Sequence, residues 1–238
     1  RVKWSMYQRQ VDSRRTFFGV TLIVALLACA VMSNGVVQAS DHIGVYAGGH
    51  ETAGMGGGVT YTYSVELKAD DTYEIKSYFI MGDTLYEFIE TGAYIVDGSK
   101  LVITPEGQDA IEGTLNSDGS ITTQVKPSQM ASKRTESTLI PSNVPAAGVY
   151  KATLQGATSV EATLYLTHQG EYFYIAVPGN DSEAVHENGA YSAQGTDITF
   201  KVADSDTTFV GTAQDGKVTA PFIVSAMMGM RMEIELAK

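Results

Sequence analysis

Hydrophobic and polar residues alternate along short stretches of this chain, and turn-forming residues separate the stretches. In the stretch 59–67, Val59, Tyr61 and Tyr63 alternate with threonines, and the stretch 160–166 shows the same alternation. Successive side chains of a β-strand point to opposite faces, so each stretch predicts a strand with one buried face. No window after residue 40 shows a helical stripe. This spacing predicts roughly six to eight short antiparallel strands in each unit of about 95 residues.

The pattern occurs twice. Gly44-Val45-Tyr46 recurs as Gly148-Val149-Tyr150, and Glu90-Thr91-Gly92-Ala93-Tyr94 recurs as Glu187-Asn188-Gly189-Ala190-Tyr191. The first copy is longer near its start, which predicts a long glycine-rich loop at 50–58. Internal repeats indicate repeated structural units. We expect a signal peptide at 1–39, a first β-barrel repeat at 40–140, a linker at 141–145 and a second β-barrel repeat at 146–238.

The predicted fold class is all-β, with two tandem antiparallel barrels or barrel-like sandwiches after an N-terminal signal helix. Dipeptides such as Asp97-Gly98, Asp118-Gly119, Asn188-Gly189 and Asp215-Gly216 are expected to form the turns between strands.

The first 39 residues have the features of an export signal. A basic stretch ends at Arg15, an apolar run follows from Phe17 to Met32, and Val37-Gln38-Ala39 precedes Ser40. This order predicts a secretory signal peptide cleaved after Ala39, with an uncleaved anchor as the alternative. Ser13-Arg14-Arg15-Thr16-Phe17-Phe18 resembles a twin-arginine motif, so both export routes stay open. We expect a periplasmic or secreted protein.

Charge and cysteine content narrow the class further. The chain has 16 basic and 27 acidic residues. Residues 1–39 contain five of the basic residues and one of the acidic ones. The rest of the chain therefore has 11 basic and 26 acidic residues, a net charge of −15. Such a charge argues against nucleic acid and anionic lipid as partners. The only cysteine, Cys29, lies in the leader, where Leu26-Leu27-Ala28-Cys29 resembles a lipobox. Membrane contact is therefore expected only through the leader or a lipid on Cys29.

Several short motifs resemble a known family. The motifs are the Gly-x-Tyr strand at Gly44, Asp71-Thr72-Tyr73 and the stretch from Gly98 to Ile103. Together they resemble calycin or lipocalin-like barrels, and most of all the N-terminal domain of NlpE-type copper-resistance lipoproteins. That family carries Cys-x-x-Cys after the first Gly-x-Tyr, whereas this chain has Gly48-Gly49-His50-Glu51. Thiol chemistry is therefore not implied.

The resemblance also suggests a role for two arginines. Lipocalins place an arginine of the last strand against the first-strand aromatic residue. Arg134 and Arg231, beside Tyr46 and Tyr150, would fit such cation–π contacts. The alternative is that both arginines face solvent, because Arg231 shares strand parity with glutamates.

Tyrosine is in excess, with 13 Tyr against 8 Phe and one Trp. On strands, tyrosines can line a barrel interior and bind a ligand, or they can simply fill the core. The candidate ligand-binding residues are Tyr61, Tyr63, Tyr73, Tyr172 and Tyr174.

A methionine run near the end of the chain is the main candidate for a metal site. Met228, Met230 and Met232 share a strand face, and thioethers suit Cu(I). The alternative is that they fill the core. His50 is the other tentative metal ligand, with a solvated loop residue as the alternative.

No motif of a nucleophile with its base, a metalloprotease or a phosphate loop occurs in the sequence. We therefore expect no enzyme and no cofactor. The sequence favours an exported envelope protein that binds a small apolar or amphipathic molecule in a barrel. Two alternatives stay open. One is a structural protein that interacts with an envelope protein, and the other is a metal-handling protein.

Overall fold

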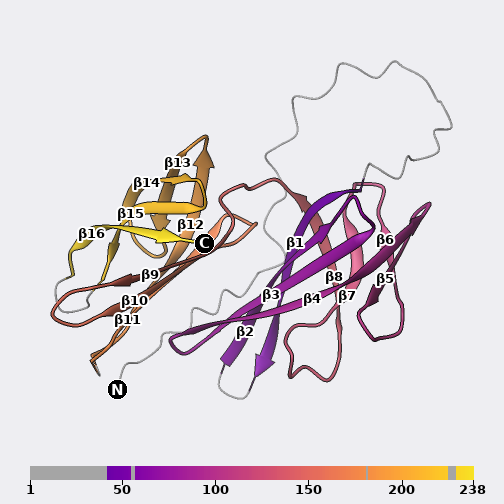
Figure 1. Cartoon of the computed structure of the whole chain (residues 1–238), viewed down its shortest axis with the longest axis horizontal. Helices are drawn as coiled ribbons and strands as arrows, with labels where there is room; N and C mark the ends of the chain where they lie inside the picture. Colours follow the sequence, from indigo (N-terminus) through magenta and orange to yellow (C-terminus); the bar gives the residue numbers. More distant parts are fainter. Residues whose placement is uncertain (1–41, 55–56, 181, 225–228) are drawn as a thin grey trace.

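The structure is a computed structural model that describes residues 42–54, 57–180, 182–224 and 229–238. The expected signal peptide at 1–39, with its helix, twin-arginine motif and Cys29, lies outside the described residues. The described chain forms two closed antiparallel barrels of eight strands each. Figure 1 shows them next to each other, the first in purple to pink and the second in orange to yellow. The predicted fold class is confirmed.

Each barrel follows the chain strand by strand, so every strand pairs with its sequence neighbours. The first barrel consists of β1 (Gly44–Gly54), β2 (Gly57–Leu67), β3 (Thr72–Met81), β4 (Thr84–Asp97), β5 (Lys100–Pro105), β6 (Ile111–Leu115), β7 (Ile121–Val125) and β8 (Thr135–Ser142). It closes where Val45–Ala47 of β1 pairs with Ile140–Ser142 of β8.

The second barrel repeats this order. Its strands are β9 (Gly148–Leu154), β10 (Val160–Leu166), β11 (Glu171–Pro178), β12 (Val185–Gln194), β13 (Asp197–Val202), β14 (Thr208–Gln214), β15 (Lys217–Ile223) and β16 (Arg231–Ala237). Ala237 of β16 pairs with Lys151 of β9 and closes it. Pro141 and Ser142, which were expected in the linker, belong to β8.

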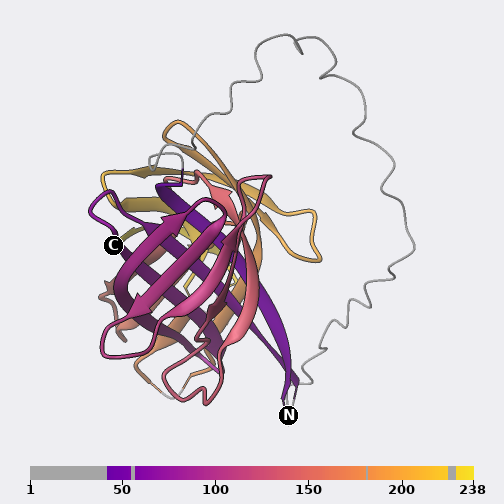
Figure 2. The ribbon, with the colours of Figure 1, turned by 90° about the vertical axis from the view of Figure 1, so that its right-hand side faces the viewer.

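The long first loop expected at 50–58 is wrong. β1 and β2 pair continuously from Gly44↔Leu67 to Gly54↔Gly57, so the additional residues lengthen a hairpin. β1 and β2 have 11 residues each, whereas β9 and β10 have 7 each. In Figure 2 the purple hairpin extends past the rest of the first barrel. Glycine lacks a side chain but keeps both backbone hydrogen-bonding groups, so a glycine-rich stretch can still pair as a strand.

The turn expected at Asn188-Gly189 is also wrong, because both residues lie inside β12. A Cβ atom at Gly189 would lie 2.9 Å from the Tyr172 ring and would clash with the Lys201 carbonyl. Gly92 in β4 occupies the equivalent position, where a Cβ would lie 2.8 Å from the Tyr73 ring. These glycines are required by close approach and not by a turn.

The outer faces of the two barrels contact each other through tyrosines. The Tyr78 ring of β3 lies 4.5 Å from the Tyr165 ring of β10, between centroids. The hydroxyl groups of Thr62 and Tyr165 are hydrogen-bonded at 2.6 Å. All three side chains are buried although they point away from their own barrel interiors. The barrels therefore share a packed interface. No helix in the described part of the chain has the length and hydropathy to span a membrane.

Candidate binding surfaces

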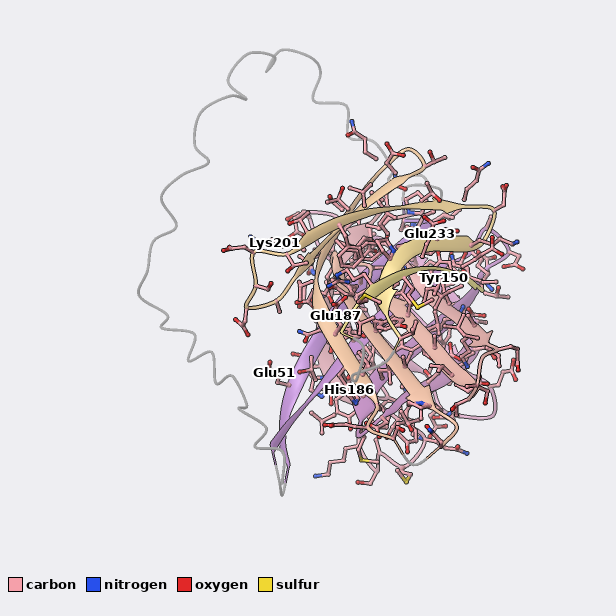
Figure 3. All side chains as sticks on the ribbon, turned by 90° about the vertical axis from the view of Figure 1, so that its left-hand side faces the viewer. Glu51, Tyr150, His186, Glu187, Lys201 and Glu233 are labelled. Carbon is pink, nitrogen blue, oxygen red and sulfur yellow. The ribbon has the colours of Figure 1, made fainter. Side chains whose placement is uncertain are left out.

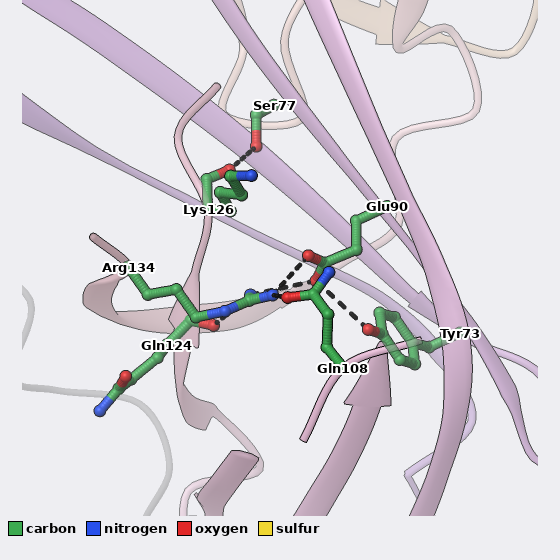
Figure 4. Close-up of polar contacts among 7 residues, drawn as sticks. All are labelled: Tyr73, Ser77, Glu90, Gln108, Gln124, Lys126 and Arg134. Carbon is green, nitrogen blue, oxygen red and sulfur yellow. Dashed lines mark hydrogen bonds and ion pairs between the residues drawn. The ribbon is translucent and has the colours of Figure 1, made fainter. Parts of the chain in front are cut away.

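An ion pair crosses the interior of the first barrel. Arg134, just before β8, donates two hydrogen bonds to Glu90 on the opposite strand β4, at 2.6 and 3.1 Å. Glu90 also accepts a bond from the Tyr73 hydroxyl at 3.2 Å, and Gln108 accepts one from Arg134 at 3.0 Å. Figure 4 shows this group. Glu90 is only 6% exposed, so the bidentate arginine compensates a buried carboxylate.

The second barrel contains the same arrangement. Arg231 donates to both carboxylate oxygens of Glu187, at 2.5 and 3.2 Å, and the Tyr172 hydroxyl donates to Glu187 at 3.2 Å. Glu187 is buried in the second barrel and is labelled in Figure 3. The guanidinium also lies 4.1 Å from the centroid of the Phe209 ring. We call each Tyr–Glu–Arg group a cross-barrel link. Each link spans the interior of its barrel with charged side chains.

Neither role expected for the two arginines is correct. Arg134 and Arg231 do not face solvent, and they do not contact the first-strand tyrosines. Instead, Tyr46 and Tyr150 donate hydrogen bonds to the backbone oxygens of residues four positions before them, at 2.8 and 2.7 Å. Each arginine reaches inward because a partner carboxylate lies there, which strand parity alone could not indicate.

Side chains fill the interiors of both barrels. In the second barrel the rings of Tyr174 and Phe222 stack at 4.4 Å, and those of Tyr172 and Phe200 meet edge to face at 5.1 Å. The first barrel is filled by a cluster that includes Tyr63, Val65, Leu67, Tyr73, Ile75, Tyr94, Leu101, Ile103, Ile121, Val125 and Leu139. Barrels of about eight strands often fill in this way. A ligand would therefore bind at a barrel end and not in a barrel interior.

A large cavity lies at one end of the second barrel. It has a volume of about 960 Å³ and is bounded by the β9–β10 and β11–β12 loops and the start of β16. Leu154, Val160, Val224 and Ile234 form its apolar floor. Glu183 and Glu233 are among the exposed polar residues at its sides. This combination suits a molecule with an apolar part and a polar, uncharged or cationic part.

At the corresponding end of the first barrel, β1–β4 extend beyond the cross-barrel link. A row of four aromatic side chains runs across the inner face of this extension, and we call it the aromatic row. The rings of His50, Tyr61, Phe79 and Tyr86 come from strand positions that pair directly in register. Neighbouring centroids are separated by 5.2, 5.1 and 4.9 Å. Such cross-strand aromatic pairs stabilise a sheet.

His50 is tied to this row by a hydrogen bond. Its Nδ1 lies 2.5 Å from the Tyr63 hydroxyl, and its Nε2 is buried without a partner in the described residues. Burial lowers the pKa of His50 and raises that of Tyr63. Both groups are therefore neutral near pH 7. The expectation of a solvated loop residue is wrong, because His50 is part of a sheet.

Met230 and Met232 do not fill the core. Met230 is 63% and Met232 46% exposed, although Ile234 and Leu236 further along β16 are buried. Met232 lies at the large cavity, where its flexible thioether side chain can adapt to ligands of different shape. Met228 lies outside the described residues. No group of three or more His, Cys, Asp or Glu among the described residues could bind a metal ion, and copper binding stays a prediction.

The structure places the histidine and the tyrosines predicted from sequence at three different locations. It brings Tyr61, Tyr63 and His50 together at the extension of the first barrel. Tyr73 and Tyr172 belong to the cross-barrel links, and Tyr174 lies in the second core, where its hydroxyl has no partner among the described residues. Sequence reasoning missed Glu90 and Glu187 as interior residues. The repeated Glu-x-Gly-Ala-Tyr motif was the available signal.

Comparisons with known proteins give low similarity. No protein-family model and no curated protein matches the chain. Among solved structures, the Cpx pathway activator NlpE from Escherichia coli is 12% identical with a TM-score of 0.28, covering 82% of this chain and 91% of that one. A porin-like protein from Bacteroides uniformis is 12% identical with a TM-score of 0.28, and the match covers 81% of this chain and 94% of that one. A DUF3598-family protein of unknown function from Nostoc punctiforme is 10% identical with a TM-score of 0.21, and the match covers 82% of this chain and 94% of that one. These scores are low, and no part of the proposed function rests on them.

Proposed function

We propose that this protein is an exported, non-catalytic binding protein of the cell envelope. It binds a small apolar or amphipathic molecule at the open end of its second barrel. One observation supports this most directly, the cavity of about 960 Å³ above a filled core. Ligand pockets usually have volumes of about 300–1,000 Å³ and mainly apolar walls. The export part of the proposal rests on the leader sequence.

The lining of the cavity defines the ligand class. Leu154, Val160 and Val224 provide the apolar contacts, and burying an alkyl chain against them gains about 0.8 kcal/mol per CH₂ group. Glu183 and Glu233 lie at its sides and would repel an anionic head group. The expected ligand is therefore a neutral or cationic amphiphile.

Binding of Nile red, a neutral probe whose fluorescence rises in apolar surroundings, tests this proposal. Ala157 is exposed and lines the cavity, so Ala157→Trp fills the site without changing the core. Ala193→Trp adds the same ring to an exposed position of β12, towards the other end of the barrel. We expect Ala157→Trp to weaken binding by about tenfold and Ala193→Trp to leave it unchanged. Equal affinity in all three proteins would refute the site.

A further inference from the structure

The longest strand of the first barrel has a free edge. β4 pairs with β3 from Thr84 to Ala93, but it pairs with β5 only from Gly92 onwards. Within the described part of the chain, no strand lies on the other side of Thr84–Thr91. We call this segment the β4 edge. Unpaired strand edges are templates for another strand, and proteins usually cover or charge them.

The direction of the backbone groups along this edge follows from one hydrogen bond. The carbonyl of Thr91 accepts from the backbone N–H of Glu106, on the β5 side, at 3.1 Å. In an antiparallel strand, the N–H and C=O of one residue point to the same side and alternate from residue to residue. Leu85, Glu87 and Ile89 therefore present both groups to the free side. No backbone partner for them occurs among the described residues.

Apolar side chains lie on both faces of the edge. Tyr86 lies on the inner face as the last ring of the aromatic row and is 39% exposed. Phe88 is next to it on the same face and is half-buried. Ile89 lies on the outer face and is 48% exposed. A strand added beside β4 would bury all three side chains and continue the aromatic row.

The outer face of the edge is not packed shut by the second barrel. Leu85 and Glu87 line an open cavity of about 240 Å³ together with Lys151 and Val177 of that barrel. Side chains from an added strand therefore have space on this side.

We propose that the β4 edge binds an extended segment of another protein by strand addition. Alternate residues of that segment would be apolar, to contact Tyr86 and Phe88, and the others basic, to face Glu87. A second copy of this chain fits poorly, because antiparallel self-pairing would bring the Glu87 carboxylates of two strongly acidic chains together. Main-chain hydrogen bonds would supply affinity, and the alternate side chains specificity.

A displayed library of random peptides tests this proposal, because it samples many partner sequences at once. Peptides of about ten residues are long enough to span the edge. The full chain would be the target, and Ile89→Pro would be the comparison, because it removes an N–H that faces the free side. Proline is tolerated at such edge positions. Ile89→Thr is the matched control, since it shortens the side chain and keeps the N–H. Circular dichroism would establish that each variant is folded.

We expect enrichment of alternating apolar and basic peptides. Their binding should weaken by about tenfold or more in Ile89→Pro and much less in Ile89→Thr. If Ile89→Pro does not fold, Glu87→Lys serves instead and should lose the basic peptides. Absence of enrichment, or equal binding to both variants, would overturn the proposal. So would a wild-type dimer that Ile89→Pro converts to monomer, because it would identify a second copy as the occupant. The Nile red site is in the other barrel, so the two proposals fail independently.

Discussion

Arg134 and Glu90 come from opposite walls of the first barrel and meet in its interior, with the closest N–O distance at 2.6 Å. Arg231 and Glu187 form the equivalent pair in the second barrel. In both copies the arginine follows the glutamate by 44 positions. The link is thus a shared element of the repeated unit, whereas the surfaces beyond it differ between the copies.

Removing the arginine should destabilise the protein strongly. Arg134→Met leaves Glu90 buried without its cation, which typically costs about 3–5 kcal/mol. Arg134→Met combined with Glu90→Leu removes both charges and should recover part of this loss. Urea unfolding of the single and double variants measures the difference. A single variant as stable as the wild type would show that the carboxylate is compensated elsewhere.

The glycine beside each link should resist substitution. Gly92→Ala and Gly189→Ala each force a Cβ against a tyrosine ring and a backbone carbonyl of the next strand. We expect each to lower stability by about 1–3 kcal/mol, as overpacking does. Gly156→Ala is a control, because its Cβ would meet nothing closer than 3.5 Å. Thermal unfolding would compare the three; similar midpoints for all would argue against the close approach.

The interface between the barrels should depend on Tyr165. Tyr165→Ala removes the ring contact with Tyr78 and the hydrogen bond to Thr62. We expect the two barrels to unfold in separate calorimetric transitions in this variant. Tyr165→Phe loses only the hydrogen bond, worth about 1 kcal/mol, and should keep the coupling. A single transition in Tyr165→Ala would mean that other contacts join the barrels.

Stability should fall as the pH drops from neutral towards 5. Burial lowers the pKa of His50, and burial with nearby Lys238 and Lys76 lowers that of His168. The unfolded chain, with histidine pKa values near 6.5, therefore binds protons at a higher pH than the folded protein does. The contribution of the two neutral histidines to the free energy of unfolding is fully present above about pH 6.5 and decreases below it. Urea unfolding at pH 7.5 and 5.5 measures the loss.

The comparison for this effect is the double variant His50→Gln with His168→Gln. Its stability should change less between the two pH values than that of the wild type. An equal change in both proteins would assign the pH dependence to other groups.

The fold followed from the sequence because alternation and repetition are local signals. Val59, Tyr61 and Tyr63 display a period of two, and the repeated Gly-x-Tyr strands marked two units. Strand ends were harder to predict, since the hairpin at 44–67 continues through glycines that also suit a loop. Which of two possible roles a glycine takes depends on its neighbours across the sheet.

The surfaces could be predicted only in part. Tyr61, Tyr63 and His50 meet because of the register in which β1 and β2 pair. The spacing of residues in the sequence does not determine that register. The parity of Arg231 suggested solvent, but its long side chain reaches Glu187 across the barrel. The cavity beside Met232 is formed by two loops and the start of β16, which are distant in sequence. Such sites form only when folding brings segments that are distant in sequence next to each other.

Methyl NMR during titration with monolauroyl glycerol, a neutral amphiphile, tests the central claim most directly. We predict that the methyl signals of Leu154, Val160, Val224 and Ile234 at the cavity shift together and saturate. Those of Leu139 and Ile121 in the first barrel should stay unchanged. Absence of shifts at saturating amphiphile, or equal shifts in both barrels, would contradict a binding site at the end of the second barrel.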